Sequence, residues 1–193
     1  KNYNKISKII ALDLSKNAIL SLIPRNTTYH NVQDIVIPAL GDFQNLPYTN
    51  YFDFVIAFGS LHHAPCLFTL MQQISKSLKD GGFLISQEPT MSNQTTNQSY
   101  INKYEMFETV EGLTIRNGDR DDHFFRECEY LCAAAYNQLD LMLIENYGDV
   151  STVDISRDEI TDIIEIQPKV MIFKKNRCDD IPHMWRPLRT NRN

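Results

Sequence analysis

The chain has 193 residues, 42% of them apolar and 22% charged, so it is long enough for one domain with a sizeable core. Its net charge of −5 provides no positive surface for nucleic acid or an anionic membrane, and no apolar run approaches the roughly 20 residues that span a bilayer. The apolar run near the N-terminus is short, ends at Asp13 and lacks a small-residue cleavage site, so it makes a poor signal peptide. We therefore expect a cytoplasmic protein with no nucleic-acid partner and no membrane partner.

The cysteines are too few and too scattered for a disulfide framework; they are Cys66, Cys128, Cys132 and Cys178. Cys128 and Cys132 have the spacing to share one face of a helix. A metal site would need two more ligands in a recognisable spacing, and none appears. We expect these cysteines to pack in the core, and we predict no metal.

In the first half of the chain, short β-branched runs alternate with helical stretches. The expected strands are residues 6–12, 35–40, 52–58 and 83–87, and the expected helices are residues 16–23 and 65–79. Ser15 is placed to cap the first helix and Pro24 to end it. Near-continuous apolar strands such as the first and third are typical of strands buried on both faces of a parallel sheet. Together these elements predict a doubly wound α/β fold.

The second half begins with a polar loop and ends with a surface tail. Between them we expect a helix over 124–137, a strand over 139–145 and a last strand over 169–173. The predicted buried face of that helix comprises Phe125, Cys128, Leu131, Cys132 and Ala135. Ser156–Glu159 has the capping-box pattern and predicts a further helix to about Ile166. The tail has Trp185 as its one anchor.

Two carboxylates follow the first two strands. Asp13 ends the first strand, and ligands of open α/β sheets bind beyond the carboxyl ends of strands. It can accept both hydroxyls of a ribose, or it can simply cap the next helix. Asp42 follows the second strand and can accept the exocyclic amine of an adenine, with Phe43 covering the ring. The alternative is an ordinary polar loop.

The third strand ends in a glycine and two histidines. Gly59 lets the backbone approach a ligand closely. His62 or His63 can act as a general base. The alternative is that one histidine caps the following helix and the other faces solvent.

Four segments, in order and at the right spacing, resemble the S-adenosylmethionine-dependent methyltransferases of the Rossmann-like class, especially the type 11/12 small-molecule group. They read ALDLSKNAIL, GDFQNLPY, FDFVIAFGSLHH and ISKSLKDGGFLISQEP. The resemblance is clear over residues 6–89 and looser over 123–174. It implies an α/β, Rossmann-like, doubly wound and mostly parallel sheet with an antiparallel C-terminal strand. It also implies S-adenosylmethionine as the cofactor.

The resemblance assigns roles to individual residues. Asp13 would hold the ribose hydroxyls, and Leu14 would pack beside the adenine. Asp42 would take the adenine amine and the Phe43 backbone would meet the ring. Phe58 and Gly59 would line the floor below the sulfonium, and His62 and His63 would lie nearest the methyl acceptor as the catalytic candidates. In the family, segments like residues 90–123 cover the acceptor as a loop or lid, which makes Phe107, His123 and Phe124 candidates for that wall.

The chain departs from the family at its start. The family signature is a strand, a turn of the G-x-G-x-G type and a helix, all before the segment that matches ALDLS. Only about five residues precede that strand here. We infer that residues 1–175 are a partial methyltransferase domain, lacking the first strand and the glycine-rich loop, with residues 176–193 as the tail. Two strands would then have unpaired edges; the alternative is a rearranged sheet that closes the gap.

The resemblance predicts methyl transfer to an unidentified, small-molecule acceptor. A nicotinamide-dependent Rossmann oxidoreductase is the alternative from another enzyme class, and a non-catalytic methyltransferase-like remnant is the alternative outside enzymes. The segment GDFQNLP followed by the DGG turn favours the methyltransferase. The sequence leaves the oligomeric state open.

Overall fold

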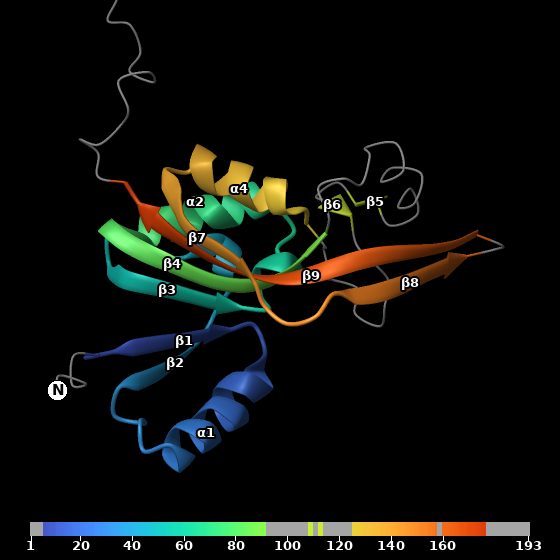
Figure 1. Ribbon diagram of the computed structural model, residues 1–193. Helices are drawn as coiled ribbons and strands as arrows, with labels where there is room; N and C mark the ends of the chain where they lie inside the picture. The colour runs from blue at the N-terminus through green and yellow to red at the C-terminus, as the bar shows by residue number, and fades with distance from the viewer. Residues whose placement is uncertain (1–5, 92–107, 110–111, 114–124, 158–159, 177–193) are drawn as a thin grey trace, which may run out of the picture. The chain divides into compact units, whose positions relative to one another are not determined.

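The computed structural model describes residues 6–91, 108–109, 112–113, 125–157 and 160–176. The chain divides into two compact units between Pro47 and Tyr48 (Figure 1). Most of the expected lid (90–123) and tail (176–193) lies outside the described residues, and so do Phe107, His123, Phe124, Cys178 and Trp185.

The first unit is built on a two-stranded parallel sheet. β1 (Ile9–Asp13) and β2 (Val36–Leu40) pair along their whole length, and Asp13 lies beside Leu40. Both strands lie close to their predicted positions because each is a short β-branched run bounded by turn residues. The prediction that β1 is buried on both faces is wrong, however, because its end residues are exposed and its middle residues are only partly covered.

The helix between these strands continues past Pro24, contrary to the prediction. A π-helical turn, η1 (Ala18–Leu22), leads directly into α1 (Ile23–Tyr29). Pro24 lies in the first turn of α1, where the missing proline N–H costs little, so the ring does not end the helix. Ser15 acts as the predicted cap, since its hydroxyl accepts the Ala18 N–H at 3.3 Å.

The second unit contains a mixed five-stranded sheet. Its strands are β3 (Phe52–Phe58), β4 (Leu78–Met91), β7 (Leu139–Asn146), β8 (Ser151–Arg157) and β9 (Ile160–Lys175). The order is β3-β4-β9-β7, with β8 paired to β9. β3 and β4 are parallel, whereas β9 is antiparallel to β4, β7 and β8. The expected α/β fold with an antiparallel C-terminal strand is confirmed.

β4 is longer than predicted, because it begins directly after the preceding helix rather than at Phe83. Gly82 lies where β3 and β4 come together. A Cβ atom there would lie 2.9 Å from the carbonyl oxygen of Lys79 and 3.1 Å from that of Asp53. Glycine therefore permits this close approach of the two strands.

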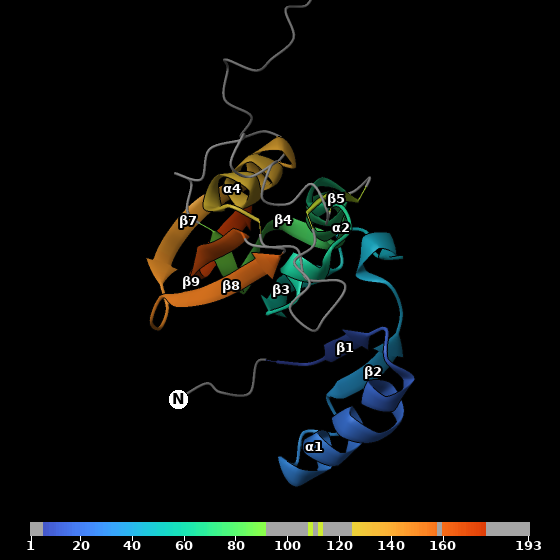
Figure 2. The ribbon, with the colours of Figure 1, turned by 90° about the vertical axis from the view of Figure 1, so that its right-hand side faces the viewer.

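Two helices cover one face of this sheet. α2 (Leu67–Ser77) and α4 (Glu127–Tyr136) lie side by side over the strands in both views (Figures 1 and 2). The predicted apolar residues of α2 are all buried: Leu67, Leu70, Met71, Ile74 and, at the start of β4, Leu78. No helix in the described part of the chain is long and apolar enough to cross a membrane.

α4 buries a different face from the predicted one, although Phe125, just before the helix, is buried as expected. Its buried residues are Tyr130, Ala133 and Ala134. The helix begins at Glu127 rather than at residue 124, and the large Tyr130 ring takes the place in the core that the cysteines were expected to fill. Core packing is wrong for Cys132, which is exposed; Cys128 is half-buried, and burial raises the pKa of its thiol.

The helix predicted from the capping box at Ser156 is wrong. β8 and β9 instead form an antiparallel pair that brings Arg157 beside Ile160. Isoleucine and threonine dominate the run from Ile160 to Ile166, and pairing along a partner strand outweighs a local capping pattern. A second short pair, β5 (Glu108–Thr109) with β6 (Gly112–Leu113), lies in the segment expected to be a loop.

One face of β3 is uncovered, so the expectation of a fully buried strand is wrong. Phe54, Ile56 and Phe58 alternate along it and are 58%, 63% and 62% exposed, whereas Ala57 on the other face is buried. Among the described strands, β1 pairs only with β2, and β3 pairs with no strand other than β4. The two lie in separate sheets, so no rearranged ladder joins them in this part of the chain.

Candidate active site

The carboxyl ends of β1 and β2 bring two of the predicted site residues to one edge of the first unit. The strands are parallel and end together at Asp13 and Leu40. The Gly41 N–H donates to the Asp13 carbonyl oxygen at 3.1 Å. The loop that carries Asp42 therefore starts beside the end of β1.

Both carboxylates are exposed, and each is held by a tight turn. Asp13 Oδ1 accepts the Ser15 N–H at 2.7 Å. Asp42 Oδ1 accepts the Gln44 N–H at 2.7 Å and caps the 3₁₀ turn η2 (Phe43–Asn45). At Asp42 the structure has the ordinary polar turn of the alternative interpretation. At Asp13 the helix is capped by the Ser15 hydroxyl and not by the Asp13 carboxylate, which binds the Ser15 N–H. Each turn occupies Oδ1 of its carboxylate and fixes the orientation of the group, which is compatible with a ligand at the remaining oxygen.

Apolar side chains accompany these carboxylates. Leu14 is 63% exposed directly after β1, and Phe43 is half-buried at the start of η2. This edge of the first unit therefore combines two oriented carboxylates, which can accept hydrogen bonds, with apolar surface that can cover a flat ring. An adenosine group requires both features.

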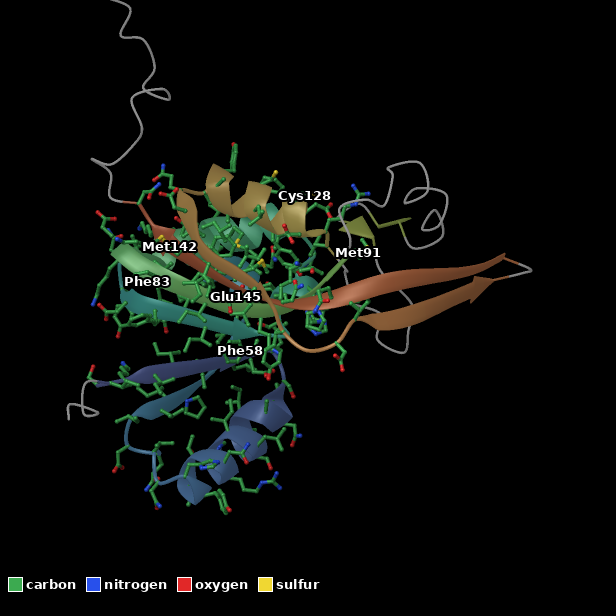
Figure 3. All side chains as sticks on the ribbon, viewed as in Figure 1. Phe58, Phe83, Met91, Cys128, Met142 and Glu145 are labelled. Carbon is green, nitrogen blue, oxygen red and sulfur yellow. The ribbon has the colours of Figure 1, made fainter. Side chains whose placement is uncertain are left out.

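The predicted residues of the second unit gather at the carboxyl end of β3. Phe58 is the last residue of the strand and is largely exposed (Figure 3). Gly59 has φ +57° and donates its N–H to the Gln87 carbonyl oxygen at 2.8 Å. The left-handed conformation, rather than lack of space, requires glycine here, since an added Cβ would meet nothing closer than 3.9 Å.

The two histidines lie in the turn that follows, η3 (Leu61–His63). His62 is buried and His63 half-buried, and their ring centroids are 4.1 Å apart. His62 Nδ1 lies 2.7 Å from Glu88 Oε2. The first histidine therefore neither caps α2 nor faces solvent.

The sequence analysis missed Glu88, which is 1% exposed near the end of β4. Its Oε1 accepts the N–H groups of Ser60 at 3.0 Å and Leu61 at 2.9 Å, and its Oε2 accepts the His62 N–H at 3.3 Å. With His62 Nδ1, the carboxylate has four hydrogen-bonding partners. The sequence holds one sign of this role: Glu88 is a carboxylate at the end of an apolar strand. Its side chain lies on the face of the sheet that the helices cover.

Tyr130 of α4 was also missed. Its side chain is fully buried, and its hydroxyl has no hydrogen-bond partner among the described residues. Burial, and secondly the charge of Glu88, raise the pKa of Tyr130 well above the usual range, so the phenol stays neutral. Phe125 packs edge-on against it, with 5.7 Å between the ring centroids.

The structure thus brings the predicted residues together in two groups. Asp13, Leu14, Asp42 and Phe43 belong to the first unit, and Phe58, Gly59, His62 and His63 belong to the second. Each group lies at the carboxyl ends of parallel strands, where α/β proteins bind ligands.

The chain resembles known methyltransferases in sequence and in fold. The methyltransferase domain family matches residues 1–84. A tRNA (guanine(26)-N(2))-dimethyltransferase of Schizosaccharomyces pombe is 31% identical over 139 residues, which make up 70% of this chain. The chain spans 24% of the length of that relative.

Solved methyltransferase structures share the fold. A protein of Bacillus halodurans C-125 assigned as a methyltransferase has a TM-score of 0.65 at 14% identity, covering 88% of this chain and 84% of its own. Geranyl diphosphate C-methyltransferase from Streptomyces coelicolor A3(2), solved with geranyl diphosphate and S-adenosyl-L-homocysteine, has a TM-score of 0.59 at 14% identity, covering 87% and 65%. Residues 1–84 therefore match the methyltransferase domain family, and the chain has the Rossmann-like fold of S-adenosylmethionine-dependent methyltransferases.

Proposed function

We propose that the protein transfers a methyl group from S-adenosylmethionine to a small-molecule acceptor and that Asp13 and Asp42 hold the adenosine half of the cofactor. The observation that carries this proposal is the pair of exposed carboxylates at adjacent parallel strand ends, each fixed by its own turn. A carboxylate that is already oriented loses little freedom when it accepts a hydrogen bond from a ligand.

In this proposal the adenosine is recognised by complementary hydrogen bonds. Asp13 accepts from the ribose hydroxyls, and Asp42 accepts from the adenine amine. Leu14 and Phe43 contribute apolar surface to the base. The fit rests on the chemistry of these side chains. The two carboxylates can accept hydrogen bonds from donors on the ligand, and the apolar side chains beside them can contact a flat ring.

The second group of residues serves the acceptor side. A bound S-adenosylmethionine supplies a methyl group already activated by its sulfonium, so the protein mainly has to orient the acceptor and exclude water. Phe58 offers an apolar surface beside Gly59. Where the acceptor carries a proton, His62 or His63 removes it as a general base.

We propose a small molecule rather than RNA as the acceptor. The curated relative is a tRNA methyltransferase, but this chain matches only a quarter of it and carries a net charge of −5. RNA binding relies on Lys and Arg at phosphates, and a negative chain opposes it. Methylation of a guanine-containing tRNA, measured with radiolabelled cofactor, would overturn this part of the proposal.

Nuclear magnetic resonance titration with adenosine tests the adenosine assignment directly. We expect chemical shift changes at residues 12–15 and 41–44. 2′-Deoxyadenosine, which lacks one ribose hydroxyl, should bind more weakly through loss of a bond to Asp13. Inosine, which lacks the exocyclic amine, should bind more weakly through loss of the bond to Asp42. Shifts spread over the chain, or equal affinity for all three nucleosides, would contradict the assignment.

Two variants sharpen the test. Asp13→Asn and Asp42→Asn each keep a side-chain oxygen for the local turn but lose a charged acceptor. Each should weaken adenosine about 10- to 100-fold, the effect of one hydrogen bond to a charged group. The matched control is Asp34→Asn, an exposed carboxylate in the turn before β2, which should change nothing. S-Adenosylhomocysteine should bind in preference to NADH; the reverse order would favour an oxidoreductase.

A further inference from the structure

Glu88 joins the ends of two strands through its side chain. It lies on β4, 26 to 28 residues from the turn after β3, and it binds three consecutive backbone N–H groups there. Each oxygen has two partners: Oε1 binds Ser60 and Leu61, and Oε2 binds the backbone and ring of His62. This many donors around one buried side chain indicates an ionised carboxylate.

The same carboxylate determines which nitrogen of His62 carries the proton. An ionised carboxylate can only accept hydrogen bonds, so the 2.7 Å contact places a proton on Nδ1. In a neutral imidazole the other nitrogen, Nε2, then carries the lone pair. The side chains of His62 and Glu88 are 10% and 0% exposed, so little water competes with this contact.

We propose that Glu88 is a positioning residue for the acceptor side of the methyltransferase: it holds the turn Ser60–His63 at the end of β3 and keeps neutral His62 in the tautomer whose basic nitrogen is Nε2. The catalytic part of this inference rests on the proposed function, in which His62 is one of the two candidate bases. The tautomer itself is a property of the chain and can be measured without any acceptor.

Long-range ¹H–¹⁵N spectra of the histidine rings test the tautomer in the wild-type chain. We expect His62, in its neutral form, to be protonated on Nδ1. His30 is the internal reference, because it is exposed and its ring contacts the edge of Tyr29 rather than a carboxylate. A neutral His62 with its proton on Nε2 would overturn the proposal.

Glu88→Gln tests whether the carboxylate is the cause. A glutamine can keep one oxygen for Ser60 and Leu61 while its NH₂ donates to His62 Nδ1, so the ring proton should move to Nε2. The Leu61 amide should exchange with solvent about tenfold faster, because its charge-assisted bond becomes a weaker bond to a neutral amide oxygen. The Gly59 amide, which is bound to β4 backbone, should keep its rate.

These outcomes separate the positioning role from a merely structural one and from the proposed function. Faster exchange with an unchanged His62 tautomer would make Glu88 structural only and would overturn the proposal. If Glu88→Gln does not fold, the tautomer of His62 in the wild-type chain still tests the proposal. Adenosine binding should be the same in Glu88→Gln and wild type. If neither protein bound adenosine, the result would count against the cofactor assignment and not against the role of Glu88.

Discussion

Replacing Tyr130 by phenylalanine should stabilise the protein. The Tyr130 side chain is fully buried, and its hydroxyl has no hydrogen-bond partner among the described residues. A buried hydroxyl without a partner costs about 1–3 kcal/mol of desolvation, and phenylalanine keeps the ring and its contact with Phe125. We expect the free energy of unfolding to rise by about 1–2 kcal/mol, which corresponds to a melting temperature about 2–8 °C higher for a chain of this size.

The pH dependence should differ as well. The pKa of Tyr130 is raised in the folded state by burial first and by the Glu88 charge second, so folding disfavours the phenolate. Below about pH 10 the phenol is neutral in both states and contributes no pH dependence. Above it the unfolded chain ionises first and wild type loses stability, a loss that Tyr130→Phe avoids. The stability difference between the two proteins should therefore widen above about pH 10.

Chemical denaturation at neutral and alkaline pH measures both effects. The matched control is Tyr136→Phe on the same helix, where the tyrosine is 79% exposed and the change should stay within about 0.5 kcal/mol. A loss of about 1 kcal/mol or more in Tyr130→Phe would refute the reasoning, because it would mean that the hydroxyl is hydrogen-bonded in solution.

Two further substitutions test the fold of the second unit. Gly82→Ala would place a Cβ atom 2.9 Å from the Lys79 carbonyl oxygen, so we expect the free energy of unfolding to fall by about 1–3 kcal/mol in chemical denaturation. Any self-association of the chain seen in sedimentation velocity should be weakened by Ile56→Lys on the uncovered face of β3, because this substitution adds charge to an exposed apolar surface. Leu20→Lys is the control, because Leu20 on η1 is 77% exposed, and the same effect there would argue against a β3-specific surface.

The sequence predicts the bounds of three short strands closely. β2, β3 and β7 lie within one residue of their expected bounds, because apolar β-branched runs between turn residues have few alternatives. The capping box at Ser156 fails because β9 supplies a long partner for that segment. A four-residue pattern weighs little against a ladder of this length.

Part of the candidate site could likewise be predicted from the sequence and part could not. The carboxylates of the first unit could be predicted from local order, since each follows a strand directly. Glu88 and Tyr130 could not: their surroundings depend on which residues share a face of the sheet and on how α4 packs. The expected buried face of α4 is wrong for that reason, because the packing of the helix on the sheet buries Tyr130, Ala133 and Ala134.

The bonds to Glu88 also set an order of folding. The turn Ser60–His63 has its N–H groups satisfied by a residue 26 to 28 positions later, so β4 must be in place before the turn is stable. During synthesis on a ribosome, β3 would emerge before α2 and β4, so the turn after β3 would at first lack Glu88. We expect nascent chains to leave this turn mobile until Glu88 has emerged from the ribosome and to order it only afterwards. The histidines would then acquire their geometry late, as a product of strand pairing rather than of the local sequence around them.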